Sequence, residues 1–141
     1  MKKIILLLIF VCSLSVAGFS PVPYPMLEIT LPEPIRPYER IWRATCAIES
    51  GNNPRAYNSR EKATGIAQIR PIKLSDYNQR MGKGYILYDC YDPEISQEIF
   101  FFYATQYHYS DILGICKEWN GRGPKHKEYY KKIKKQLSIM K

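Results

Sequence analysis

Glu49 is the residue of this 141-residue chain best placed to act as a general acid. It stands in "AIESGNNPRAYN", where a helical pattern ends at Ser50 and Gly51 and a polar loop begins. A carboxylate in the last helical turn faces the negative end of the helix dipole, which disfavours its ionisation. Partial burial by neighbouring side chains would raise its pKa further. A carboxylic acid that keeps its proton near neutral pH is what cleavage of a glycosidic bond requires.

Other polar side chains in three stretches would suit a glycan site. "NPRAYN" ends at Asn58, "GIAQIRP" contains Gln68, and "KEWNGRGP" contains Trp119 and Asn120. An amide side chain donates and accepts hydrogen bonds, which matches the hydroxyl and N-acetyl groups of a sugar. Structural explanations stay open: Gln68 as a buried amide bonded to backbone, and Asn120 as the cap of a turn.

The element that carries Glu49 is predicted to be a helix over 38–50. Ile41, Thr45 and Ile48 fall on one face at helical spacing, and the Gly-Asn-Asn run ends the helix. The expected helix would therefore hold Glu49 at its C-terminal end, where the loop begins.

The middle of the chain predicts further helices around irregular segments. A short helical stretch broken at Pro71 precedes a second one over 72–81. The tyrosine-rich stretch 82–93 is irregular and is the part that allows a short strand pair. Asp92 then caps, and Pro93 opens, the clearest helix of the chain. Because that helix is apolar on more than one face, it is expected to be central in the core.

Basic residues are concentrated at the C-terminal end. From Lys117 to Lys141 there are nine Lys or Arg and two Glu, whereas residues 19–116 hold ten basic and eleven acidic residues. Beyond a helix around 111–119, apolar residues recur at helical spacing, so the lysines predict the solvated face of an amphipathic helix. The alternative is attraction to an anionic polymer or membrane surface. A uniformly basic nucleic-acid face is not indicated, and no nucleic acid is expected as a partner.

Residues 1–17 are typical of a secretory signal peptide. Two lysines precede an apolar run, and small residues up to Ala17 suit cleavage. The run is too short to span a bilayer. Cys12 raises lipid attachment as an alternative, which ranks lower because Val11 is large for such a site. We therefore expect an exported protein, periplasmic or secreted.

A proline-rich arm is expected over 18–36. Six of the ten prolines fall between Pro21 and Pro37, and proline lacks an amide donor and biases the residue before it away from helix. The folded domain is then 37–141, and its class is mainly α.

Three cysteines, Cys46, Cys90 and Cys116, remain after the signal. Their wide separation argues against a zinc site, and no metal is expected. Cys46 lies on the apolar helix face and is expected to be a small buried residue. A Cys90–Cys116 disulfide is possible in an oxidising compartment, but the sequence does not establish it.

Four stretches in order resemble the lytic transglycosylases of the soluble-lysin (SLT) type, which share the goose-type-lysozyme architecture. Members of that family show a helix ending in Glu-Ser, then Asn-Pro-x-Ala-x-Ser, then Gly-Leu-Met-Gln-Ile-x-Pro, then Tyr-Asn-Ala-Gly. The corresponding stretches here are Glu49-Ser50, "NPRAYN" at 53–58, "GIAQIRP" at 65–71, and Trp119-Asn120-Gly121. The similarity covers roughly residues 38–135.

The resemblance implies a compact lysozyme-like helical domain that cleaves the MurNAc–GlcNAc bond of peptidoglycan. Glu49 would act as acid and then as base, while the muramic-acid 6-hydroxyl attacks to give a 1,6-anhydro sugar. This reaction needs no second carboxylate and no cofactor. Asn58, Gln68, Trp119 and Asn120 would bind the glycan. Trp119 stands where the family has a tyrosine that contacts the acid, and an indole accepts no hydrogen bond.

Two alternatives remain. A lysozyme-type hydrolase would need a second carboxylate across a water-sized gap from Glu49. The nearest candidates by sequence are Asp76, Asp89 and Asp92. A non-catalytic glycan-binding protein on the same fold is the other alternative. The tryptophan in place of tyrosine favours it, whereas Glu49, Gln68 and Asn120 together argue against it.

Overall fold

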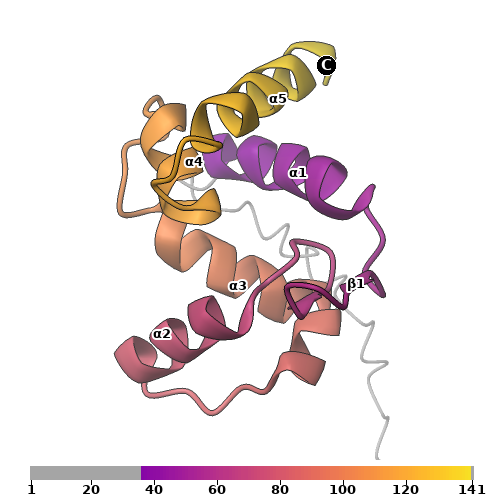
Figure 1. Ribbon diagram of the computed structural model, residues 1–141. Helices are drawn as coiled ribbons and strands as arrows, with labels where there is room; N and C mark the ends of the chain where they lie inside the picture. The colour runs from indigo at the N-terminus through magenta and orange to yellow at the C-terminus, as the bar shows by residue number, and fades with distance from the viewer. Residues whose placement is uncertain (1–35, 141) are drawn as a thin grey trace, which may run out of the picture. The chain divides into compact units, whose positions relative to one another are not determined.

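The computed structural model describes residues 36–140, all within one compact unit of the chain, Leu31–Lys141 (Figure 1). The elements in chain order are α1 (Arg36–Ser50), β1 (Tyr57–Asn58), β2 (Ala63–Thr64), α2 (Pro71–Met81), the 3-10 helix η1 (Leu87–Tyr91), α3 (Pro93–Ala104), α4 (Ile112–Asn120) and α5 (His126–Ile139). The predicted mainly α class with one small strand pair is confirmed. The predicted signal peptide over 1–17, Cys12 and the arm up to residue 35 lie outside the described residues.

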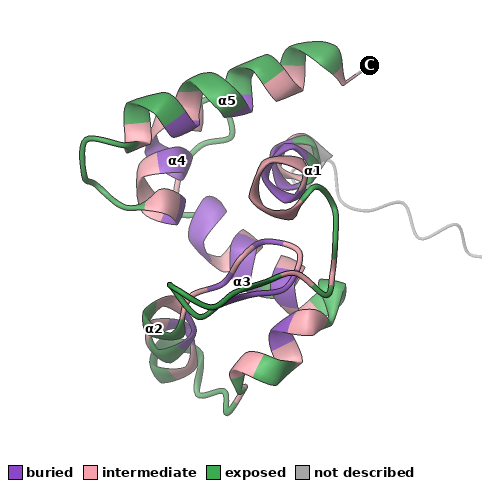
Figure 2. Ribbon diagram, turned by 45° about the vertical axis from the view of Figure 1, so that its right-hand side comes forward, coloured by how far each residue is buried: buried purple, intermediate pink, exposed green. Residues whose placement is uncertain are grey.

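Helix α3 lies at the centre of the core, as its apolar pattern predicts. Ile99 and Phe100 are fully buried, and α3 packs against α1, α2, α4 and η1. Figure 2 shows buried residues on α3 and α4 in the interior and exposed residues along the outer face of α5. The start of α3 follows the expected cap, because the Asp92 carboxylate accepts a hydrogen bond from the N–H of Glu94 at 2.9 Å.

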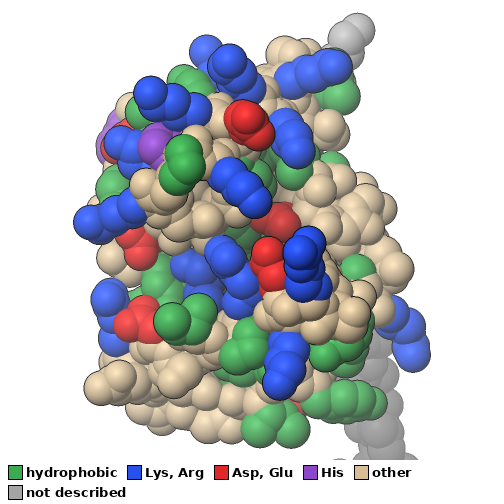
Figure 3. All heavy atoms as spheres, in the orientation of Figure 1, with side chains coloured by type: hydrophobic (Ala, Val, Ile, Leu, Met, Phe, Trp, Pro, Cys, Tyr) green, Lys and Arg blue, Asp and Glu red, His purple; other side chains and the backbone are tan. Residues whose placement is uncertain are grey.

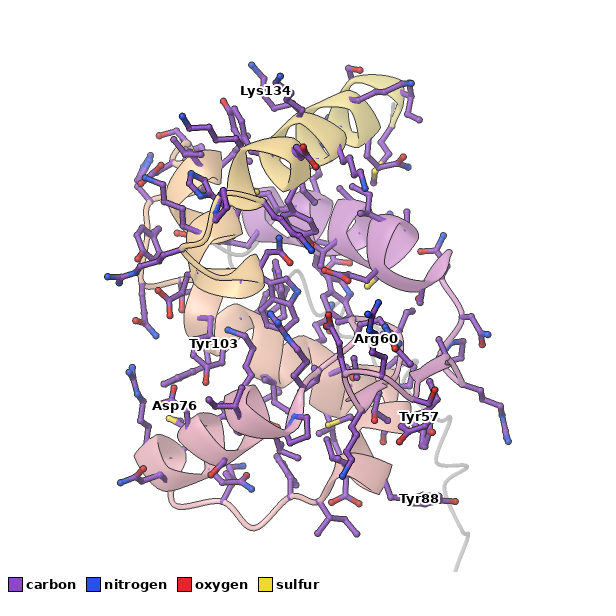
Figure 4. The ribbon with its side chains drawn as sticks, in the orientation of Figure 1. Tyr57, Arg60, Asp76, Tyr88, Tyr103 and Lys134 are labelled. Atoms are coloured by element: carbon purple, nitrogen blue, oxygen red, sulfur yellow. The ribbon has the colours of Figure 1, made fainter. Side chains whose placement is uncertain are left out.

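Helix α5 packs along α1 and α4 and closes the domain above the end of α1. Its amphipathic pattern is confirmed, because Tyr129 and Ile133 are buried and its lysines are exposed. Lys134 points away from the protein in Figure 4. The first helix likewise buries Ile41 and Thr45 on the face that the sequence predicts.

The strand pair lies earlier in the chain than expected. β1 and β2 pair antiparallel, Tyr57 with Thr64 and Asn58 with Ala63, whereas the stretch 82–93 contains η1 instead. The expectation of strands there was wrong because a local bond stabilises a tight turn. The Asp89 carboxylate accepts a hydrogen bond from the N–H of Ile86 at 2.8 Å.

The three cysteines of the described residues are buried free thiols, so Cys90 and Cys116 form no disulfide. Cys46 is buried as predicted. Within residues 36–140, no helix is long and apolar enough to cross a membrane.

Candidate active site

Glu49 lies in the last turn of α1, and the chain turns sharply after it. Gly51 has a φ of +63°, and its N–H donates to the carbonyl of Ala47 at 3.2 Å, which closes the helix. The Ser50 hydroxyl donates to the carbonyl of Ile66 at 2.7 Å. This bond ties the end of α1 to the loop after β2 and fixes Glu49 beside that loop.

A polar cavity of about 110 Å³ opens at Glu49. Figure 3 shows basic and acidic side chains gathered around a hollow in the middle of this face. The residues that line the cavity are Glu49, Asn58, Glu61, Ala63, Gln68, Arg70, Lys73, Trp119 and Asn120. The cavity therefore brings together all five residues that the sequence suggested for catalysis and binding, from α1, the hairpin, the loop before α2 and α4. Their roles remain predictions.

Burial raises the pKa of Glu49 above the ordinary value of 4.5, and the nearby Glu61 carboxylate adds to the rise. The Tyr129 hydroxyl, Arg70 and Lys132 act in the opposite direction, but burial is the largest effect. Glu49 therefore keeps its proton at pH values where an ordinary glutamate is ionised. This is the protonation state that a general acid needs.

Tyr129 of α5 belongs to the surroundings of Glu49, and the sequence gave it no functional role. The side chain is 8% exposed, and its hydroxyl faces Glu49 and Thr45 closely enough that Glu49 and Tyr129 shift each other's pKa. This contact is not a hydrogen bond, because the Tyr129 hydroxyl has no hydrogen-bond partner within residues 36–140. Burial, together with Glu49, raises the pKa of Tyr129, so the hydroxyl keeps its proton. Its place in the apolar repeat of α5 predicted burial but not this neighbour.

Trp119 is a wall of the cavity and part of the core. It is 4% exposed, and its ring lies 5.0 Å from that of Phe100 and 6.3 Å from that of Tyr103, measured between centroids. In this chain the Tyr129 hydroxyl of α5 lies near the acid without a hydrogen bond to it, while Trp119 supplies packing from α4.

The amide side chains of Gln68 and Asn58 each form hydrogen bonds with backbone groups. Gln68 has a φ of +52°, and its Nε2 donates to the carbonyls of Gly65 at 3.0 Å and Ala56 at 3.3 Å. The Asn58 Oδ1 accepts from the N–H of Arg60 at 3.1 Å. Each residue thus supports the hairpin and keeps one polar group, the Gln68 carbonyl or the Asn58 amino group, for other partners.

None of the three aspartates named as second-carboxylate candidates lines the Glu49 cavity. Asp89 and Asp92 cap η1 and α3, and Asp76 accepts from the Tyr103 hydroxyl at 2.7 Å. Glu61, from the turn between the strands, is the second carboxylate of the cavity. It was missed because its neighbours in the sequence carry no signal of a site. Among the described residues, no three His, Cys, Asp or Glu gather where a metal ion could bind.

Residues 38–108 match the family model of the transglycosylase SLT domain. The chain belongs to the SLT transglycosylase family. Searches of curated proteins and of solved structures give no match. The SLT match contains Glu49, Asn58 and Gln68 and ends before α4 and α5, so Trp119 and the α5 residues lie beyond it. The family acts on peptidoglycan and belongs to the glycan-cleaving, lysozyme-like enzymes.

Proposed function

We propose that this protein is a peptidoglycan lytic transglycosylase that cleaves the MurNAc–GlcNAc bond and leaves a 1,6-anhydroMurNAc end. One observation carries the proposal: a glutamate whose pKa is raised by burial lines a polar cavity in a chain of the SLT family. Burial of a single carboxylic acid suits a reaction in which that group first gives a proton and then takes one.

Glu49 would act twice in the reaction. The protonated carboxyl gives its proton to the glycosidic oxygen, so the bond from C1 of MurNAc to that oxygen breaks and the GlcNAc hydroxyl leaves. The carboxylate then takes the proton of the MurNAc 6-hydroxyl, whose oxygen bonds to C1. No water is consumed, and Glu49 recovers its proton. The Tyr129 hydroxyl would stabilise the ionised carboxylate between the two steps.

We further propose that Asn58, Gln68, Trp119 and Asn120 hold the sugars beside Glu49. Gln68 offers its carbonyl oxygen to a sugar hydroxyl or amide, since its Nε2 is taken by backbone carbonyls. Asn58 offers its amino group for the same reason. Trp119 supplies a flat apolar wall from α4.

A hydrolase is the second candidate, and Glu61 is the observation that favours it. A hydrolase of the inverting type needs a carboxylate that activates water opposite the acid. Glu61 lines the same cavity as Glu49, and its only described ion pair is a loose one to Arg70 at 3.9 Å. In the lyase, Glu61 has no chemical step to perform.

Mass spectrometry of digested peptidoglycan distinguishes these candidates. The purified protein, Glu49→Gln and Glu61→Gln are incubated with the same wall preparation, and the released muropeptides are analysed. The lyase predicts 1,6-anhydroMurNAc ends from the wild type and from Glu61→Gln. It also predicts a loss of at least about 10²-fold in Glu49→Gln, the usual contribution of a general acid.

Reducing ends that depend on Glu61 would replace the lyase by the hydrolase. If folded wild-type protein releases nothing from several wall preparations yet still binds glycan, the non-catalytic alternative holds. Thermal unfolding of each variant verifies that a lost product reflects chemistry and not folding.

The cellular setting is part of the proposal. Export through a signal peptide over 1–17 and a proline-rich arm over 18–36 would deliver the domain, 37–141, to the periplasm or outside the cell. SLT domains typically work in that exported, cell-wall setting. The exposed lysines of α5 would hold the enzyme on an anionic wall or membrane surface, an attraction that salt weakens.

A further inference from the structure

Two basic side chains, Arg70 and Lys73, line the cavity of Glu49 from the start of α2. They stand three residues apart, so they project from neighbouring positions on one side of the helix. The reaction proposed above uses neither of them. Their position in the cavity suggests that they bind an anionic group of the ligand.

Lys73 is unusually placed for a lysine. It is partly buried, and its Nζ lies 3.9 Å from the centroid of the Tyr103 ring and 5.0 Å from that of the Trp119 ring. The Nζ donates one hydrogen bond, to the carbonyl of Glu118 at 2.9 Å. An ammonium has three donors, so Lys73 can donate to two further acceptors.

The carboxylates nearest to Lys73 are engaged elsewhere. Asp76 accepts from the Tyr103 hydroxyl at 2.7 Å and from Arg80 Nε at 3.1 Å. The Glu118 carboxylate accepts from the Tyr107 hydroxyl at 3.2 Å. Within residues 36–140, Lys73 makes no ion pair.

Arg70 is also incompletely paired. Its Nη1 lies 3.9 Å from the exposed Glu61 carboxylate, and its Nη2 donates to the carbonyl of Asn120 at 3.5 Å. These are long contacts for a guanidinium, which binds a carboxylate best through two short parallel hydrogen bonds.

A second hollow of about 350 Å³ lies beside the Glu49 cavity. Arg70, Lys73 and Trp119 line both spaces, so the cations stand where the two meet. In Figure 4, Tyr103 and Asp76 point toward one another from α3 and α2, and both line this second hollow. A group attached to a sugar in the Glu49 cavity would lie near the two cations, because both line that cavity.

We propose that Arg70 and Lys73 form a carboxylate-binding subsite beside Glu49 that selects acidic glycan strands over neutral ones. The proposal rests on the proposed function, because it assumes that the glycan lies in the Glu49 cavity. MurNAc bears a lactyl group that ends in a carboxylate when no peptide is attached. When a peptide is attached, the carboxylates belong to the peptide. Either source presents the same chemistry to the two cations.

The subsite predicts a specific pH dependence of glycan binding. Burial lowers the pKa of Lys73 to about 8, and the charges of Arg70 and Arg80 add to this, against the carboxylates of Glu118 and Asp76. Tyr103 on α3, whose ring lies beside the ammonium, stays protonated because burial raises its pKa. The carboxyl groups of Glu49 and Glu61 line the same cavity as Lys73. A bound carboxylate stabilises the ammonium, so binding above pH 8 must first add a proton to Lys73. Affinity for acidic glycans should therefore fall as the pH rises through about 8.

Calorimetric binding to the Glu49→Gln protein tests the subsite without turnover. Three ligands of equal sugar number are compared: a neutral chito-oligosaccharide, a peptide-free GlcNAc–MurNAc oligomer and a peptide-bearing strand. We expect the carboxylate-bearing ligands to bind at least about tenfold more tightly than the neutral one, the range of a charge-assisted hydrogen bond. The pH series should show the fall near pH 8 for the acidic ligands alone.

Variants in the same background identify the cations responsible. Arg70→Gln and Lys73→Gln should each reduce the preference by about tenfold, to near the affinity of the neutral ligand. Lys73→Arg should keep the preference and remove its fall near pH 8. Arg43→Gln is the matched control, since it removes one positive charge from an exposed pair on α1, and it should change nothing.

The outcomes separate the two proposals. Equal binding of neutral and acidic glycans, or a preference unchanged in both Gln variants, overturns the subsite and leaves the proposed function standing. Absence of binding to all three ligands by folded protein overturns the proposed function itself. Tight binding of the peptide-free oligomer identifies the lactyl carboxylate, and tight binding of the peptide-bearing strand alone identifies the peptide. If Lys73→Gln does not fold, Arg70→Gln decides the outcome.

Discussion

Replacing Gly65 with alanine tests how the loop that carries Gln68, between β2 and α2, is held against η1. Gly65 has a φ of +79°, and a Cβ there would overlap the carbonyl oxygen of Cys90 and lie 2.8 Å from its carbonyl carbon. That oxygen also accepts a hydrogen bond from the Ser96 hydroxyl at 2.7 Å. The clash is with buried backbone, which cannot turn away as a flexible side chain would.

The cost of this substitution has two parts. An alanine in the left-handed region costs about 1–2 kcal/mol. Overfilling a packed interior adds about 1–3 kcal/mol. Gly82→Ala isolates the first part, because Gly82 has a φ of +62° and a Cβ there meets nothing within 4 Å. We therefore expect Gly65→Ala to lose about 2–5 kcal/mol of unfolding free energy and Gly82→Ala about 1–2 kcal/mol.

Urea unfolding followed by far-ultraviolet circular dichroism measures both variants against the wild type. Equal losses in the two variants would refute the close approach of Gly65 to Cys90, since only the backbone conformation would then matter. A loss confined to Gly65→Ala would refute the assigned left-handed conformation of Gly82.

Three further predictions concern the site and the core. Arg70→Gln should raise the pKa of Glu49, because the positive charge of Arg70 lowers that pKa in the wild type. NMR titration of the Glu49 carboxyl group measures the change, and an unchanged midpoint would contradict the prediction. Asp92→Ala should lower the unfolding free energy, measured by urea unfolding, by about 1 kcal/mol, because it removes the cap of α3. Asp92→Asn keeps a capping oxygen and should be close to the wild type in stability. Equal stability of the two variants would contradict this. Burial raises the pKa of the thiols of Cys46, Cys90 and Cys116 to about 12. Iodoacetamide at pH 8 should therefore modify these thiols only after the protein unfolds. Labelling of the native protein would contradict this prediction.

Features that depend on neighbours in the sequence could be predicted. The Asp92-Pro93 pair marks the start of α3 because the cap bonds an N–H two residues away. Glu49 falls at the end of α1 because the glycine after Ser50 stops the helix locally. The family resemblance then added Asn58 and Gln68, whose spacing from Glu49 belongs to a longer pattern.

Features that depend on packing could not be predicted. Tyr129 is eighty residues beyond Glu49, and only the contact of α5 with α1 brings them together. Lys73 and Glu61 looked like ordinary surface charges, because sequence does not show that their helix and turn border a cavity. The sequence allowed a strand pair in the irregular stretch 82–93, whereas the Asp89 side chain stabilises a 3-10 turn there.

Glu49 also links activity to stability. Its pKa is higher in the folded protein than in the unfolded chain, so the folded state holds this proton more tightly. The stabilisation that this provides is complete at acid pH and is lost as the pH rises from about 4.5 through the folded-state pKa. Glu49→Gln should therefore be no less stable than the wild type at neutral pH.

The pKa of Glu49 itself is the measurement that tests the account most directly. Carbon-13 NMR of side-chain-labelled glutamates gives it as the midpoint of the carboxyl titration, and the signal missing from Glu49→Gln assigns it. The account predicts a midpoint clearly above 4.5, because burial outweighs the Tyr129 hydroxyl and the nearby cations. A midpoint at or below 4.5 would contradict it, since Glu49 would then be ionised when it has to give a proton to the glycosidic oxygen.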